Sequence, residues 1–480
     1  MSFDGALGLA APELLLSGLA LVLLLVGAIG GQRTTGFIAT VAGLGLLGAA
    51  YLAATGPRGT AFADGFVADS LAAFARTAIY AMSAVGVLLG DRWLAKKGDS
   101  KFEFSILVLL AAVGMGMMAA AGDLISLYVG VELQSLALYV LAALRRNDAK
   151  ASEAGLKYFV LGALSSGLLL YGASLIYGFA GSTHFAVIAK VVHAGAGTGV
   201  LFGLVFLICG LAFKVSAAPF HMWTPDVYEG APTPIVGFFA AAPKLAAMVL
   251  FARALMVAFP GALEQWRQVV MALAALSMLW GAFAGLAQNN LKRLWAYSSI
   301  ANVGYALVGL SVGGAVGVQA MLMFMVLYMI DVTGFFACLT ALTRDGRPME
   351  TMDDMAGLVR QRPGLAMAMT AFSLSALGLP PFSGFWAKVY VFKAALGAHD
   401  VWLTGLAVLG LVSSVVAAFY YLRLIKVMWF DPSAGETDAA PMFAKSVAYA
   451  AALFSFPVVM LALVALDPAA AAAAAAFTPH

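Results

Sequence analysis

Long apolar segments dominate the hydrophobic and polar pattern of this chain. They fall at residues 10–30, 36–55, 70–90, 103–121, 123–144, 154–180, 199–222, 232–257, 266–288, 291–312, 315–343, 364–398, 401–430 and 443–467. A helix needs about 20 apolar residues to cross the hydrocarbon core of a bilayer. Only helices and closed barrels can span lipid, and these segments are too long for barrel strands. The pattern therefore predicts an all-α polytopic membrane protein with about fourteen transmembrane helices.

The composition excludes a soluble enzyme. Of the 480 residues, 63% are hydrophobic and only 11% are charged, whereas soluble domains are about a quarter charged. The net charge of +3 and the absence of a long basic run give no sign of nucleic-acid binding. Cys209 and Cys338 both lie in apolar stretches and are too few for a four-cysteine cluster. No basic segment precedes the first apolar run, which we expect to be a retained helix.

Basic residues between the apolar segments predict the orientation. If the N-terminus lies outside, the outer loops contain Arg58, Lys190 and Arg267. The inner loops contain Arg33, Arg92, Lys96, Lys97, Lys101, Arg145, Arg146, Lys150, Lys292, Arg293, Arg344, Arg347, Arg360, Arg362, Arg423, Lys426 and Lys445. Since Lys and Arg accumulate in loops on the cytoplasmic side, this distribution predicts that both termini lie outside.

Two apolar segments contain a similar proline-broken motif. Residues 218–223 read APFHMW and residues 380–386 read PPFSGFW. Proline removes a helix hydrogen bond, so we expect discontinuous helices in the seventh and twelfth segments. The five-helix offset is odd, which predicts two inverted-topology repeats of the kind common in transporters.

This repeat divides the chain into four predicted parts. They are an N-terminal three-helix segment (1–102), a first inverted repeat (103–257), a second inverted repeat (258–430) and a C-terminal helix with its tail (431–480).

Several basic residues lie inside the apolar segments. Arg76, Arg253 and Lys393 are near outer ends, where their side chains can extend to the surface. Lys157 is about one turn from the inner end of its segment and can do the same.

Three lysines, Lys214, Lys244 and Lys388, are too deep to reach water. A lysine in lipid can escape the cost of its charge by losing its proton, and a nearby carboxylate opposes that loss. Arginine cannot do this, and none lies at mid-depth. With Glu132 as the expected partner of a lysine and His221 beside Pro219, these residues predict a proton path.

Other readings of these residues remain open. The prolines could serve only to kink helices, and each lysine could belong to a static ion pair that holds helices together. Asp331, in the middle of segment 315–343, could be a packing residue, since no basic residue lies near it in sequence.

The motifs resemble the antiporter-like membrane subunits of respiratory complex I, the NADH–quinone oxidoreductase. The resemblance covers essentially the whole chain. It rests on KVSAAPFHMWTPDVYEGAPTP at 214–234, on AYSSI at 296–300 with Gly304 and Tyr305, and on FSGFWAK at 382–388. Within the family, the first motif is most similar to the subunit N group. Lys388 departs from the subunit M group, which has a glutamate there.

The resemblance implies a proton-pumping role for six residues. These are Glu132, Lys157, Lys214, His221, Lys244 and Lys388. It also implies that FMN, the iron–sulfur clusters and quinone are bound by other subunits, with no cofactor or metal in this chain.

The family further implies partners and a location. The expected partners are other membrane-arm subunits, notably subunits M, K and J, together with the lipid bilayer. The expected location is the bacterial inner membrane, with periplasmic termini. The alternative is a subunit of an Mrp-type cation/proton antiporter, whose members share these motifs.

Cysteine labelling tests the predicted orientation. A thiol introduced near His193, in an outer loop, should react with an impermeant reagent added outside, whereas one near Arg347 should not. The reverse pattern would contradict both the orientation and the inverted repeat.

Overall fold

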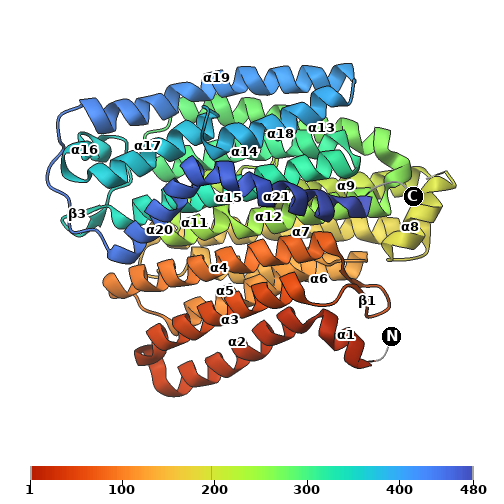
Figure 1. Cartoon of the computed structure of the whole chain (residues 1–480). Coiled ribbons are helices and arrows are strands. Elements are labelled where there is room, and N and C mark those ends of the chain that lie inside the picture. The colour runs from red at the N-terminus through yellow and green to blue at the C-terminus, as the bar shows by residue number, and fades with distance from the viewer. Residues whose placement is uncertain (1–2, 196, 478–480) are drawn as a thin grey trace.

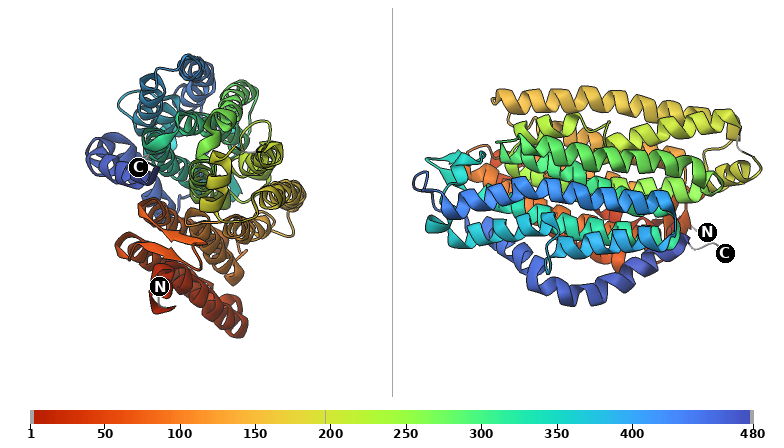
Figure 2. Two further views of the ribbon diagram at one scale, coloured as in Figure 1. Left: turned by 90° about the vertical axis from the view of Figure 1, so that its right-hand side faces the viewer. Right: turned by 90° about the horizontal axis from the view of Figure 1, so that it is seen from above.

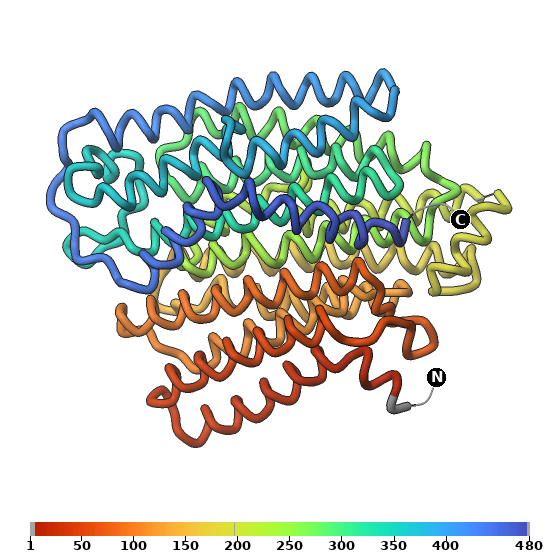
Figure 3. The backbone as a smooth tube through the Cα atoms, in the orientation of Figure 1, coloured from red at the N-terminus to blue at the C-terminus, as the bar shows by residue number. Residues whose placement is uncertain are grey.

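Helices occupy every apolar segment that the sequence pattern predicts. The computed structural model describes residues 3–195 and 197–477, and most of its helices run along one common direction (Figures 1 and 3). The helices satisfy their backbone hydrogen bonds internally, as a lipid environment requires.

The elements fall into two halves of the chain. The first half contains α1 (Phe3–Leu9), α2 (Ala11–Gly30), α3 (Thr35–Thr55), β1 (Gly59–Ala61), β2 (Phe66–Ala68), α4 (Ser70–Lys96), α5 (Phe102–Ala119), α6 (Leu124–Ala142), α7 (Ala149–Ala180), α8 (Phe185–His193), α9 (Thr198–Val215), α10 (Trp223–Gly230), α11 (Thr233–Ala240) and α12 (Ala242–Arg253). The second half contains α13 (Leu263–Leu286), α14 (Leu291–Val312), α15 (Gly314–Ala341), β3 (Thr343–Arg344), β4 (Arg347–Pro348), α16 (Leu358–Gln361), α17 (Pro363–Leu377), α18 (Ser383–Gly397), α19 (Val401–Phe430), α20 (Met442–Leu453) and α21 (Val459–Ala474).

Among the described residues, eleven helical segments are long and apolar enough to cross a membrane. The chain is therefore a predominantly helical, polytopic integral membrane protein. One of these segments, Ala11–Thr55, contains α2 and α3, which fold back on each other at Gly31–Thr34 (Figure 1).

The centre of the bundle is formed by α11, α12 and α15. Every residue of α12 is buried, as are most residues of α15. By contrast, large apolar side chains on the outer helices are exposed, including Ile29 on α2, Val415 on α19 and Leu461 on α21. An apolar exterior around a buried core is the arrangement that a bilayer requires.

Helix breaks occur at both predicted positions. Residues 216–222 separate α9 from α10, and residues 378–382 separate α17 from α18. In each case the first helix is followed directly by a left-handed residue, Ser216 at φ 66° and Gly378 at φ 89°.

Two further interruptions were not predicted. One separates α11 from α12 at Ala241, and the other lies at Phe456 between α20 and α21. Prolines at 243 and 457 are their sequence signals.

The expectation that Arg76 and Arg253 extend to the surface is wrong. Arg76 is 1% exposed and lies 3.2 Å from the Glu13 carboxylate, which also accepts a 2.7 Å hydrogen bond from the Tyr80 hydroxyl. Arg253 is 3% exposed and lies 2.6 Å from Asp69. Each guanidinium group is paired with a carboxylate that is distant in sequence. Because its charge is compensated inside the protein, the side chain does not extend to water.

Connecting elements gather at the two ends of the bundle. The hairpin of β1 and β2 and helix α8 lie at one end, whereas the β3–β4 hairpin and α16 lie at the other (Figure 1). Helix α1 and the end of α21 lie at the same end as α8 (Figure 2). His193 and Arg347, the two labelling positions, therefore belong to elements at opposite ends.

The Glu13–Arg76 pair provides a stability test. Glu13→Ala should lower the free energy of unfolding by about 3–5 kcal/mol, because it leaves a buried guanidinium unpaired. Chemical unfolding in detergent measures the change. The control is the double variant Glu13→Leu with Arg76→Met, which should recover most of the loss. If Glu13→Ala were as stable as the parent, the Glu13–Arg76 pair would not stabilise the fold.

Candidate functional site

Lys157 belongs to a half-exposed charged cluster at the ends of three helices. Its ammonium lies 2.7 Å from Glu153 on α7 and 2.8 Å from Asp226 on α10. Asp226 also accepts a 2.6 Å hydrogen bond from Arg293 on α14, which lies 3.2 Å from Glu229. The Lys157 side chain is 42% exposed. Its environment therefore differs from that of the three deep lysines.

Lys214 is positioned by the end of α9, in its last helical turn. Its ammonium donates to the Ser135 hydroxyl at 2.8 Å and lies 3.4 Å from the Tyr139 hydroxyl, both on α6. A cation is favourable near a helix C-terminus, where the backbone carbonyls are unpaired.

Glu132 lies on the same helix but forms no direct ion pair with Lys214. It precedes Ser135 by three residues, so the two side chains share a face of α6. Its Oε1 is buried without a hydrogen-bond partner. The predicted contact is thus replaced by one in which the Ser135 hydroxyl accepts from Lys214.

The break between α9 and α10 holds His221. The Phe213 carbonyl accepts a 3.0 Å hydrogen bond from the Trp223 indole and another from the backbone N–H of Ser216. The Ser277 hydroxyl accepts one of 2.8 Å from the backbone of Ala218. His221 Nδ1 is buried without a partner, and its ring lies 5.6 Å from that of Trp280. Side chains thus satisfy the backbone groups that the break releases, while the imidazole keeps a nitrogen unused.

Lys244 lies in the first turn of α12, just after the interruption at Ala241. It is 1% exposed, and its ammonium donates a 2.5 Å hydrogen bond to the Ser299 hydroxyl on α14. The Tyr328 hydroxyl on α15 donates to the same oxygen at 2.7 Å. Positive charge is disfavoured near a helix N-terminus, so of the three deep lysines Lys244 has the least support for its charge.

Lys388 reaches from α18 back across the second break. Its ammonium donates to the backbone carbonyls of Ala376 and Leu377, at 3.1 and 2.9 Å, and to the Ser414 hydroxyl at 2.7 Å. It also lies 4.7 Å from the centre of the Tyr305 ring. Gly378 makes this approach possible, since a Cβ there would lie 2.9 Å from the Lys388 side chain.

The three deep lysines share one property. Among the described residues, no carboxylate oxygen lies within 4.0 Å of the ammonium of Lys214, Lys244 or Lys388. Their partners are hydroxyls and carbonyls, which can accept a hydrogen bond without fixing a charge. These partners could not be predicted from the sequence, because a serine or tyrosine in an apolar segment is not distinctive. The described residues contain no group of three or more His, Cys, Asp or Glu that could hold a metal ion.

The chain matches a known family of membrane proteins. Residues 121–416 match the family described as NADH:quinone oxidoreductase/Mrp antiporter, TM. The matched region includes all six predicted site residues.

A similar protein indicates which subunit family within this class the chain belongs to. An NADH-quinone oxidoreductase subunit N from Caulobacter sp. (strain K31) is 75% identical over 391 residues, which are 81% of this chain and 81% of that protein. The chain belongs to the subunit N family of NADH-quinone oxidoreductase. The family resemblance of the sequence motifs is thereby confirmed.

Solved structures share the fold. One is a chain of respiratory complex I from Thermus thermophilus, which is 33% identical, with 96% of this chain and 99% of that chain covered and a TM-score of 0.81. A chain of the Mrp complex from Dietzia sp. DQ12-45-1b is 22% identical, covers 98% of both chains and has a TM-score of 0.84. The second likeness shows the fold alone.

Ser299 is the residue on which the Lys244 site depends. Ser299→Ala should lower the free energy of unfolding by about 1–3 kcal/mol, because it leaves two buried donors unpaired. Tyr328→Phe removes one donor and keeps the lysine's bond, so it should cost less. Thermal unfolding of purified protein measures both changes, and an equal loss in the two variants would contradict this geometry.

Proposed function

We propose that this chain is the proton-translocating membrane subunit N of an NADH-quinone oxidoreductase. In this role it is part of a translocase, in which electron transfer from NADH to quinone in other subunits drives proton movement through this one. FMN, the iron–sulfur clusters and the quinone belong to those other subunits. Membership of the subunit N family supports this role.

One structural observation carries the proposal. The three deep lysines, Lys214, Lys244 and Lys388, are held by neutral hydroxyl and carbonyl oxygens and not by carboxylates. A lysine in such surroundings loses little when its proton leaves, because no partner charge is left unpaired. Glu132 and His221, each with a buried atom that has no partner, are available to receive or pass on a proton.

We assign six residues to the proton path. Lys157 and its charged cluster lie at one end, and Glu132, Lys214 and His221 lie at or near the first helix break. Lys244 follows on α12, and Lys388 lies at the second break. The proton would pass between these residues in that order, from the α7 cluster to α18.

The topology we propose has fourteen crossings. They are α2, α3, α4, α5, α6, α7, the pair α9 and α10, the pair α11 and α12, α13, α14, α15, the pair α17 and α18, α19, and the pair α20 and α21. Segments 103–257 and 258–430 would then be the inverted repeats, between 1–102 and 431–480. The left-handed residue that ends the first helix at each break supports this pairing.

The assembly we propose lies in the bacterial inner membrane, with both termini in the periplasm. The partners would be the neighbouring membrane-arm subunits, including the antiporter-like subunit M and the small subunits K and J, with lipid around them. The solved complex I chain with the same fold supports partners of this kind. An Mrp-type antiporter role is less well supported, because the likeness to the Mrp chain is 22%.

Replacing Lys244 by arginine tests whether its proton moves. Arginine keeps the charge but does not lose its proton, so Lys244→Arg should assemble and lose most proton pumping and NADH–quinone turnover. Lys157→Arg is the matched control and should lose less, because Lys157 is half-exposed and paired with two acids. Both activities are measured in membranes and normalised to assembled complex. Near-normal pumping by Lys244→Arg would show that only the charge is needed.

A further inference from the structure

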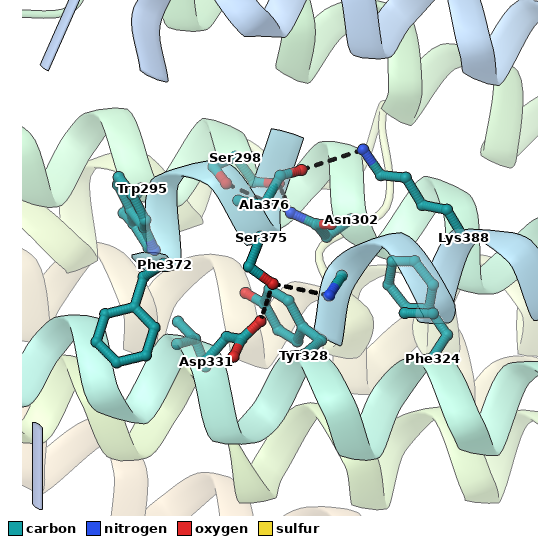
Figure 4. Close-up of a pocket in the computed structure, with 13 residues that line it drawn as sticks. Trp295, Ser298, Asn302, Phe324, Tyr328, Asp331, Phe372, Ser375, Ala376 and Lys388 are labelled. Atoms are coloured by element: carbon teal, nitrogen blue, oxygen red, sulfur yellow. Dashed lines mark hydrogen bonds between the residues drawn. The ribbon is translucent and has the colours of Figure 1, made fainter. Parts of the chain in front are cut away.

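Asp331 is a deep acidic residue that the proton path described above does not use. It lies on α15, is 8% exposed, and faces the break between α17 and α18. The Ser375 hydroxyl donates a hydrogen bond of 2.5 Å to its Oδ2 (Figure 4), and the Ser383 hydroxyl donates another of 2.6 Å to the same oxygen. Since Ser383 is the first residue of α18, the carboxylate lies at a helix N-terminus, where negative charge is favoured.

The other carboxylate oxygen is free. Oδ1 of Asp331 is buried and has no hydrogen-bond partner. Among the described residues, no basic group lies within 4.0 Å of either oxygen. A proton can therefore reside on Oδ1 without disturbing the two hydrogen bonds at Oδ2.

Asp331 and Lys388 line the same small cavity. It is lined by Asp331, Lys388 and Tyr328, among others, and has about 20 Å³ of space for water centres (Figure 4). That is enough for about one water molecule. Tyr328 donates to Ser299, the residue that also accepts from Lys244. The cavity thus adjoins Lys388 directly and Lys244 through two hydroxyls.

The oxygen cluster fits a proton better than a metal cation. The hydroxyls of Ser375 and Ser383 are 2.9 Å apart, and those of Ser383 and Ser455 are 2.8 Å apart. A cation of the size of calcium or sodium keeps its ligands about 2.3–2.6 Å away, so neighbouring ligands lie more than about 3 Å apart. These oxygens are bonded to one another and leave no space for an ion among them.

We propose that Asp331 is a proton-carrying residue that exchanges a proton with Lys388 through the cavity between them. The inference rests on the proposed function and adds a residue to it. In the forward step, the Lys388 ammonium first gives up one of its three hydrogen bonds and turns that N–H toward the cavity. This N–H bond then breaks, a water molecule passes the proton on, and an O–H bond forms at Oδ1 of Asp331. Both residues become neutral, and the net charge of the pair is unchanged.

The isosteric amide separates proton carriage from packing. The Asn side chain of Asp331→Asn has the same shape, and its oxygen still accepts from both serines, but it cannot carry the proton. We expect assembled Asp331→Asn to lose NADH–quinone turnover and proton pumping about tenfold or more, the scale of removing one proton-transfer group. Asp331→Glu should retain more of both activities. Inverted membrane vesicles provide the measurement, normalised to NADH oxidation by an artificial electron acceptor.

Two controls make the result specific. Glu264→Gln, at an exposed carboxylate, should leave both activities unchanged. Lys388→Met tests the proposed function separately: if it abolishes pumping while Asp331→Asn pumps normally, Asp331 is no carrier and the proton path stands. If Lys388→Met also pumps normally, the proposed function fails.

A poorly assembled variant or a sodium dependence of turnover would also test the role of Asp331. If Asp331→Asn assembles poorly, the pair Asp331→Glu and Asp331→Gln gives the same comparison at equal side-chain length. Equal activities in that pair, or assembly by the acid alone, would assign Asp331 to packing and overturn the proposal. Dependence of turnover on sodium in the parent, absent in Asp331→Asn, would replace the proton by a cation and also overturn it.

Discussion

The cost of placing a charge in an apolar bundle governs the arrangement of this protein. A lysine at the centre of a membrane costs about 2.5–3.5 kcal/mol on insertion scales, and this chain places Lys214, Lys244 and Lys388 deep in its bundle. The bundle meets that cost at places where helices end inside it. Helix ends expose carbonyls, and the gaps between half-helices admit hydroxyl side chains. Lys388 uses both, because it binds two carbonyls of α17 and the Ser414 hydroxyl.

The basic residues inside the bundle differ in their partners. Arg76 and Arg253, whose charge is permanent, are each paired with a carboxylate, and so is Lys292, which lies 2.8 Å from Glu350. Lys214, Lys244 and Lys388 are bound by neutral oxygens. A carboxylate would hold a lysine in its charged form, whereas a hydroxyl tolerates both forms. The division therefore separates residues that stabilise the fold from residues suited to proton transfer.

Much of the fold follows from local sequence signals. Apolar segments give the helices, and Pro219 and Pro381 mark the two breaks, because each of these effects acts within a few residues of the chain. The break at Ala241 was not predicted, although Pro243 lies in the middle of the apolar segment 232–257, because a proline inside a helix can kink it without ending it.

The partners of the buried charges could not be predicted in the same way. Arg76 meets Glu13 across 63 residues of chain, and Lys244 meets Ser299 across 55. Such contacts depend on how helices pack, which no short motif encodes. The same limit applies to Glu132, which was expected to contact Lys214 directly. In the structure the α6 residue that accepts a hydrogen bond from Lys214 is Ser135.

The most direct test of the account concerns Lys214 and the separation of proton movement from electron entry. Lys214→Ala should impair proton pumping and also slow NADH–quinone turnover, because the two are coupled. The reaction of NADH with an artificial acceptor should remain normal, because the proposed function assigns electron transfer to other subunits. If acceptor activity fell in the same proportion as pumping in a fully assembled complex, a proton-path role for this chain would be contradicted.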